Sequence, residues 1–240
     1  MICPRGHSFD IARSGYINLL QPQDRRSKQP GDTAEAIAGR RRLHDLGITD
    51  PLLNGIADFS ALSSADIALD AGCGEGFYLG NLAERTGLKG HGIDISIPAV
   101  DAAARRYPGC TWIVANADRF VPYAENSFSL IFSITARMNV NEFKRVIRHD
   151  GRLLVAIPAP DDLLELRGPG RDRIASTEET FASGFTLETR HRLTTRADLD
   201  AAAVHDVLHS IYRPLQSKPA EAMRVTFSLD LLRFRPAGTK

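Results

Sequence analysis

Short apolar runs alternate with amphipathic segments through the middle of the chain. Residues 67–70, 91–94, 111–114, 130–134 and 152–157 have the length and composition of strands, and helical patterns at 76–86, 97–107 and 141–148 lie among them. Strands separated by single helices need crossover connections, which give a mostly parallel sheet with right-handed βαβ units. The pattern therefore predicts a doubly wound α/β fold.

The two ends of the chain follow a different rhythm. Residues 34–46 predict a helix that Asp32 or Thr33 caps and Gly47 ends, and a second helix is expected at 51–59. Near the C-terminus, 185–193 and 225–234 resemble strands around a helix at 196–209. Two late strands without a parallel crossover predict an antiparallel edge. We therefore expect a mostly parallel, seven-stranded sheet with an antiparallel edge strand.

Residues 1–30 stand apart from this pattern. They hold a Cys/His pair, a short apolar run at 16–20 and a polar segment at 21–30 that offers almost no apolar surface to bury. We therefore expect two units, a small N-terminal appendage at 1–30 and a main domain at 31–240.

Composition narrows the class of protein. The 240 residues are 43% apolar and 25% charged, as in ordinary globular proteins with one substantial core. The formal net charge of +1 gives no overall attraction to nucleic acid or membrane, so any attraction must come from a local patch. The sequence has no long apolar run, and its three cysteines, Cys3, Cys73 and Cys110, are too scattered for a disulfide framework. We expect a cytoplasmic protein with no membrane partner.

The most distinctive motif follows the first of the alternating strands and reads Leu69-Asp70-Ala71-Gly72-Cys73-Gly74-Glu75-Gly76. Gly72 and Gly74 let the backbone turn tightly and approach a ligand closely, and Gly76 lets the following helix pack near the strand. A strand-to-helix turn without a ligand can use the same residues, so the motif needs support from other strand ends.

Two further strand ends supply that support. Asp94 ends the next strand, 20 residues after Gly74, where an acid can accept hydrogen bonds from both ribose hydroxyls, and Ile95 follows it. After the third strand comes Asn116-Ala117-Asp118, where a polar side chain or a backbone amide can recognise an adenine edge. Because the carboxyl ends of parallel strands share one edge of the sheet, the sequence predicts a nucleoside pocket there.

Two classes of nucleoside cofactor compete for this pocket. An NAD-type oxidoreductase would prefer G-x-G-x-x-G, but the third glycine comes one position early here. Asp70 would face a pyrophosphate unfavourably, whereas it could receive the ammonium of a methionine moiety; the alternative is an ordinary loop-capping carboxylate. Dinucleotide-binding dehydrogenases also generally lack the antiparallel edge. We therefore predict a Rossmann-like class I methyltransferase fold with S-adenosylmethionine as cofactor.

Several strings spread over most of the chain carry a resemblance to one family. They are residues 2–10 (ICPRGHSFD), 15–20 (GYINLL), 30–35 (PGDTAE), 38–42 (AGRRR), 70–76 (DAGCGEG), 94–96 (DIS), 163–168 (LLELRG) and 184–187 (GFTL). With these strings the chain resembles the bacterial 23S ribosomal RNA guanine-N1 methyltransferases, which include resistance enzymes for macrolide antibiotics. The glycine motif is common to many methyltransferases, so the N-terminal string is the more specific part.

The resemblance implies a small zinc-binding module ahead of a methyltransferase domain, acting together on a ribosomal RNA hairpin. Family members hold zinc with a C-x-x-C pair followed by a C-x-x-x-H pair. This chain has only Cys3 and His7 of that set, and two ligands plus water bind zinc weakly. We expect a degenerate zinc-ribbon-like module whose half-site holds no zinc; alternatively, the start of the chain is truncated.

A second departure from the family follows the fourth strand. Family members carry a tyrosine-alanine-proline-like turn beside the methyl-transfer site, whereas residues 133–139 read SITARMN, with Arg137 in place of the proline. Thr135 and Arg137 occupy the strand end nearest the expected methyl group and are our candidate catalytic residues, placed to position a base edge by hydrogen bonds. The alternative is a loop turn with a solvated arginine. No histidine or carboxylate stands out as acceptor of the guanine N1 proton.

The consecutive residues Arg40, Arg41 and Arg42 are our candidate substrate contacts. At most two of them can line one face of a helix. One interpretation is phosphate contact with RNA, weakened by salt, and the other is a solvated helix face.

The residues and the resemblance together predict methylation of guanine N1 in 23S ribosomal RNA. Two alternatives stay open: a small-molecule methyltransferase whose N-terminal segment acts as a lid, and a cofactor-binding relative that has lost catalysis. The sequence is compatible with a homodimer but has no feature that decides it.

Overall fold

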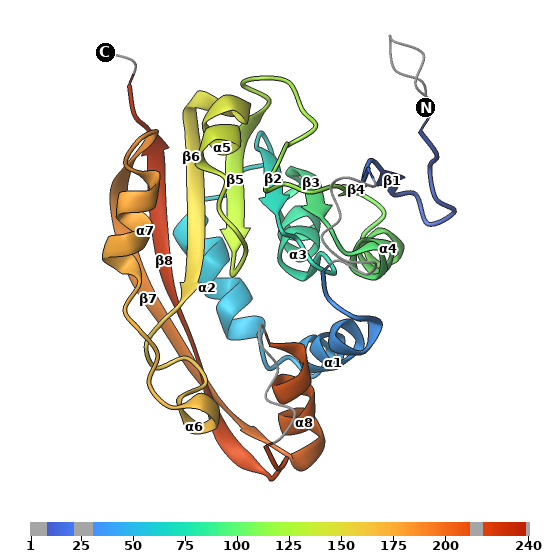
Figure 1. The fold of residues 1–240 in the computed structure, drawn as a ribbon, viewed down its shortest axis with the longest axis vertical. Coiled ribbons are helices and arrows are strands. Elements are labelled where there is room, and N and C mark those ends of the chain that lie inside the picture. The colour runs from blue at the N-terminus through green and yellow to red at the C-terminus, as the bar shows by residue number, and fades with distance from the viewer. Residues whose placement is uncertain (1–8, 22–30, 212–217, 239–240) are drawn as a thin grey trace.

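The computed structural model describes residues 9–21, 31–211 and 218–238, which form one eight-stranded sheet flanked by helices (Figure 1). The strand order is β1-β4-β3-β2-β5-β6-β8-β7. Neighbouring strands from β1 to β6 are parallel, whereas β8 is antiparallel to both β6 and β7. The strands are β1 (Ile17–Asn18), β2 (Ile67–Ala71), β3 (Lys89–Asp94), β4 (Thr111–Val114), β5 (Phe128–Ile134), β6 (Ile147–Pro158), β7 (Phe185–Leu199) and β8 (Met223–Pro236).

Helices cover both faces of the sheet and bury two separate apolar cores. On one face, α2 (Asp50–Ser60), α3 (Phe77–Thr86) and α4 (Ile97–Arg106) pack against strand residues such as Phe132. On the other face, α5 (Val140–Val146) and α7 (Ile174–Phe181) pack against residues such as Leu69. Successive strand residues point to opposite faces, so one strand serves both cores. The predicted doubly wound architecture is confirmed.

The hairpin of β7 and β8 continues past the rest of the sheet. Residues 229–234 of β8 pair with β6, whereas 223–228 pair with β7 alone. This extension carries α8 (Ala201–Ser210) to α1 (Ala34–Asp45), and the two helices lie side by side (Figure 1). The short helix α6 (Leu164–Arg167) packs against β8. A late segment of the chain thereby contacts the first helix of the predicted main domain.

The sheet has one strand more than we predicted. β1 belongs to the first 30 residues, yet it pairs with β4, with Ile17 opposite Ile113 and Asn18 opposite Val114. A strand of two residues is too short to be recognised from alternation. The antiparallel strand is β8, next to last in the sheet, and β7 forms the edge. The domain boundary at residue 30 stays a prediction.

Two element boundaries were wrong at the sequence level. Residues 196–199 continue β7 with alternating exposure, and α8 begins only at Ala201, after Asp200, whose carboxylate accepts a hydrogen bond from Ala203 N at 2.8 Å. β6 begins at Ile147, so the helix expected at 141–148 ends at Val146. In both places a strand extends the sheet into residues whose composition also suits a helix, because pairing with a neighbouring strand outweighs local propensity. Of the two candidate caps of α1, Thr33 is the one that accepts Ala36 N, at 3.2 Å.

Among the described residues, no helix is long and apolar enough to cross a membrane.

Candidate cofactor and substrate site

The glycine loop joins β2 to α3, and its glycines have the backbone conformation that the motif predicts. Gly72, Gly74 and Gly76 all have positive φ, at 92°, 53° and 77°. Side-chain size matters most at Gly76, where an added Cβ would lie 2.4 Å from Trp112 Cη2. The loop is held to β3 by bonds from the amides of Gly72 and Cys73 to Ile93 O, at 2.8 and 3.0 Å. A buried tryptophan thus packs directly on the start of α3.

Asp94 connects the end of β3 to this loop. Its Oδ2 accepts a hydrogen bond from Gly74 N at 2.9 Å, and its Oδ1 accepts one from Ser96 N at 2.8 Å. Burial raises the pKa of Asp94, although these two amides act to lower it. Each carboxylate oxygen has a second lone-pair direction, so the group can still accept bonds from two vicinal hydroxyls. This geometry fits a ribose.

Asp70 is a buried acid without a complete set of partners. Its side chain is 2% exposed, and its Oδ1 has no hydrogen-bond partner among the described residues. Burial, with a contribution from the nearby Asp94, raises the pKa of Asp70 to about 7. Buried polar groups in proteins are nearly always hydrogen-bonded, so a buried carboxyl oxygen without a protein partner is a candidate ligand contact. The site therefore fits a cofactor that brings a cationic group, as S-adenosylmethionine does.

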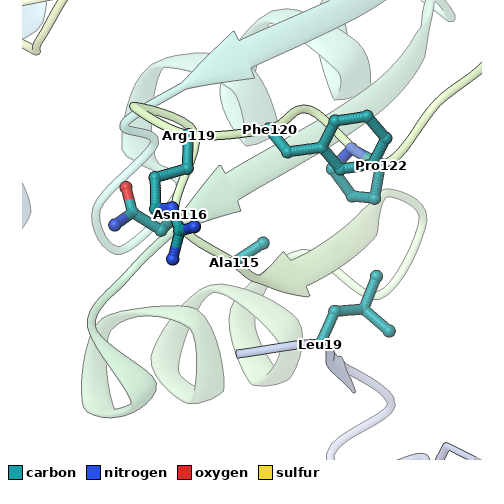
Figure 2. Close-up of a pocket in the computed structure, with 6 residues that line it drawn as sticks. All are labelled: Leu19, Ala115, Asn116, Arg119, Phe120 and Pro122. Carbon is teal, nitrogen blue, oxygen red and sulfur yellow. The ribbon is translucent and has the colours of Figure 1, made fainter. Parts of the chain in front are cut away.

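The loop after β4 lies beside the loop after β5. Asn139 Nδ2 donates hydrogen bonds to Ala117 O and Asp118 O, at 2.9 and 3.0 Å. Asn116 Oδ1 accepts a bond from Asp118 N at 3.1 Å, which shapes the turn. Figure 2 shows a pocket next to this turn, lined by Leu19, Ala115, Asn116, Arg119, Phe120 and Pro122.

The two candidate catalytic residues lie on the loop after β5. Thr135 has a φ of 50°, an uncommon and strained conformation for a β-branched residue. Ala136 packs against the glycine loop, since a Cβ on Gly72 would lie 2.5 Å from Ala136 Cβ. The Arg137 side chain is 68% exposed, with Nε 3.4 Å from Asp118 Oδ2. Thr135 and Arg137 thus lie beside the glycine loop and the loop after β4.

The three arginines of α1 do not act as one cluster. Arg41 is exposed and pairs weakly within its helix with Asp45, at 3.8 Å. Arg42 pairs with Asp206 of α8 at 2.6 Å. Arg40 instead has a 28% exposed side chain and lies near Gly74, with an Asp32 pair at 2.6 Å. Arg41 and Arg42 have the more exposed side chains of the three, at 49% and 59%.

The predicted half-site of Cys3 and His7 lies outside the described residues. In the part of the chain that the structure covers, no group of three or more His, Cys, Asp or Glu side chains could hold a metal ion.

The sequence analysis assigned no role to Ser96 or Asn139, whose side chains join separate segments of the site. Ser96 caps α4 by accepting Ala99 N, and its hydroxyl donates to Asp32 O at 2.9 Å, which ties α1 to the loop after β3. A serine before Ile-Pro at a helix start is a readable capping signal. Asn139 also caps a helix, α5, by accepting Glu142 N, but its bonds to Ala117 O and Asp118 O carry no signal in the sequence, because they join two separate loops.

Comparisons with known proteins agree with this geometry. A family model described as "Methyltransferase domain" matches residues 68–155, and one described as "RlmA, N-terminal" matches residues 1–28. A TehB-like SAM-dependent methyltransferase from Corynebacterium glutamicum has a similar structure, with a TM-score of 0.52 at 17% identity, covering 85% of this chain and 99% of that one. The class I methyltransferase fold is confirmed.

Two curated relatives match most of the chain. The putative 23S rRNA (guanine-N(1)-)-methyltransferase of Micromonospora griseorubida is 32% identical, over 98% of this chain and 90% of that protein. The 23S rRNA (guanine(748)-N(1))-methyltransferase of Streptomyces fradiae is 34% identical, over 86% of this chain and 75% of that protein. With a glycine loop bonded to Asp94 and relatives 32% and 34% identical over most of their length, the chain belongs to the family of 23S rRNA (guanine-N1)-methyltransferases.

Proposed function

We propose that this chain transfers a methyl group from S-adenosylmethionine to N1 of a guanine in 23S ribosomal RNA. The relatives that carry this activity in their names match the chain over most of its length. The structural observation that carries the proposal is the bond from Gly74 N to Asp94 Oδ2, which brings the glycine loop and the acid of the next strand together. This pair supports a nucleoside site at the carboxyl edge of the sheet.

We assign the cofactor contacts from the same edge. Asp94 accepts the ribose hydroxyls, and Ile95, which follows it, packs against the adenine. The turn Asn116-Ala117-Asp118 recognises the adenine edge. Gly72, Gly74 and Gly76 let the backbone approach the cofactor, and Asp70 faces its ammonium group.

In methyl transfer, the main task of the protein is to hold the cofactor and the guanine in the correct orientation. The bound cofactor supplies a methyl group on a positively charged sulfur, and transfer is an in-line displacement that needs no covalent intermediate on the protein. We assign Thr135 and Arg137 to positioning the guanine edge, and the packing of their loop on Gly72 through Ala136 supports this assignment. The N1 proton leaves to a base or to water.

The residues that we expect to contact RNA come from α1 and from the N-terminal module. Arg41 and Arg42 have 49% and 59% exposed side chains and can contact phosphates, so we expect RNA affinity to fall with salt. The N-terminal module at 1–30 would contribute to hairpin recognition. We place the reaction in the cytoplasm, and formation of a homodimer stays a prediction.

Transfer of labelled methyl groups to ribosomal RNA tests the proposal. The RNA is taken from a strain that lacks the cognate enzyme, and the modified nucleotide is then mapped. We expect label at N1 of one guanine of 23S RNA, and no label with the Asp94→Ala variant. Label in a metabolite pool with none in RNA would instead show a small-molecule methyltransferase. Cofactor binding without turnover on either substrate would show a relative that has lost catalysis.

A further inference from the structure

Arg40 differs from its neighbours in α1 because its guanidinium lies against the glycine loop. Nη2 donates to Asp32 Oδ2 at 2.6 Å and to Ser210 O at 3.1 Å. Nη1 reaches the loop, where a Cβ placed on Gly74 would stand 3.3 Å from it. One nitrogen of the guanidinium is therefore held in place by the protein, while another is presented to the loop.

Carboxylates surround the loop that Arg40 contacts. Asp70 has an unpartnered Oδ1 among the described residues, and neither carboxylate oxygen of Glu75, which is 6% exposed, has a hydrogen-bond partner there. Burial acts against the charged form of Arg40, but Asp32, Glu75 and Asp94 together raise its pKa. An anionic group of a ligand would be repelled by these acids and attracted by Arg40.

Tyr78, in the first turn of α3, lies beside α1, with its ring centroid 6.3 Å from that of His44. Burial raises the pKa of Tyr78 first of all, Arg40 lowers it, and Asp162 and Asp70 raise it further. Tyr78 therefore lies beside the helix that carries Arg40, and both Arg40 and Asp70 affect its pKa.

We propose that Arg40 binds the carboxylate of the methionine part of the cofactor, while Asp70 faces the ammonium group. This inference rests on the cofactor assignment in the proposed function. An α-amino acid carries its negative and positive groups on neighbouring atoms, which fits a cation and an anion beside one glycine loop. A guanidinium forms short, charge-assisted hydrogen bonds with a carboxylate. Arg40 is thus a cofactor-specificity residue, in contrast to its sequence-level assignment as an RNA contact.

Two ligands that differ in the amino-acid part test this role by calorimetry. S-Adenosylhomocysteine carries the carboxylate and the ammonium group, whereas 5′-methylthioadenosine keeps the nucleoside and lacks both. Arg40→Met should weaken S-adenosylhomocysteine binding by roughly 10- to 100-fold, as expected for a lost hydrogen bond between charged groups. Binding of 5′-methylthioadenosine should change by less than about twofold. Arg40→Lys, which keeps the charge, should lose less affinity and serves as the second variant if Arg40→Met does not fold.

Arg105→Met is the matched control, because Arg105 is a helical arginine of α4 that also pairs with an aspartate, Asp101, and its side chain is 68% exposed. It should change the affinity for neither ligand. Equal losses for both ligands with Arg40→Met would overturn the proposal and make Arg40 a support of the loop. No loss for either ligand would also overturn it, while leaving the methyltransferase function intact. If the unsubstituted chain binds neither ligand, the cofactor assignment itself is wrong and Arg40 has no such role.

Discussion

The two halves of the sheet contribute to the candidate site in different ways. On the β2–β4 side, Gly74 and Asp94 are 20 residues apart in the chain and meet through consecutive strand ends. On the other side, contacts join distant segments: Arg40 reaches Ser210 over 170 residues, and Arg42 reaches Asp206 over 164. The first half is built by a local βαβ unit and the second by the return of the β7–β8 hairpin to α1. A local βαβ unit can be predicted from a motif in the sequence, whereas contacts between distant segments cannot.

Replacement of Asp94, on the β2–β4 side of the sheet, should have the largest effect on cofactor binding. Asp94→Ala loses two hydrogen bonds from backbone amides, at 2.9 and 2.8 Å, together with the proposed ribose contacts. Hydrogen bonds to charged groups are worth about 1.5–3 kcal/mol each, so we expect the affinity for S-adenosylhomocysteine to fall by at least about 100-fold. Asp101→Ala, an acid of α4 that pairs with Arg105, is the control and should bind normally. Unchanged affinity of Asp94→Ala in calorimetry would remove Asp94 from the ribose role.

The pH dependence of binding should sharpen the role of Asp70. Burial and Asp94 raise its pKa to about 7, so the carboxyl is largely protonated below that pH in the empty protein. A cationic ligand group prefers the ionised form, and S-adenosylhomocysteine affinity should therefore rise about tenfold from pH 6 to pH 8. Asp70→Asn should lose this rise. A rise that persists in Asp70→Asn would assign it to another group, such as Glu75, whose pKa burial also raises to about 7.

The same pKa shift makes a prediction for stability, with a definite sign. The folded-state pKa of Asp70 lies above its ordinary value of 3.8, so between these pH values the folded protein binds the extra proton. The free energy of unfolding of the empty protein should therefore fall as pH rises from about 4 to about 7. Denaturant unfolding of Asp70→Asn should show a weaker fall over this window.

The smallest effect is expected for Asn139, which joins the loop after β5 to the loop after β4. Asn139→Ala removes the bonds to Ala117 O and Asp118 O, together with the cap bond from Glu142 N at 3.3 Å. We expect a loss of about 1–2 kcal/mol in the free energy of unfolding. Asn139→Asp keeps an oxygen for the cap but has no donor for the two carbonyls. If Asn139→Asp were as stable as the unsubstituted chain, the link between the loops would contribute nothing.

For the first helix of the main domain, α1, the sequence predicted the bounds but not the side-chain contacts. Its start at Thr33 and its end near Gly47 follow from capping preferences, and the structure has the helix at Ala34–Asp45. The contacts of its three arginines could not be predicted in the same way. Helical spacing alone cannot show that Arg40 meets Gly74 while Arg42 meets Asp206, because those partners belong to β2–α3 and to α8.

The sequence by itself determined the doubly wound fold, the glycine loop and the position of Asp94, because these depend on periodicity and on backbone conformations within one βαβ unit. Only the tertiary structure decided the eighth strand, the late start of α8 and the surroundings of Arg40. The physical reason is that strand pairing and contacts between elements depend on which distant segments of the chain come together. The periodicity of apolar residues along the chain does not indicate which distant segments contact each other.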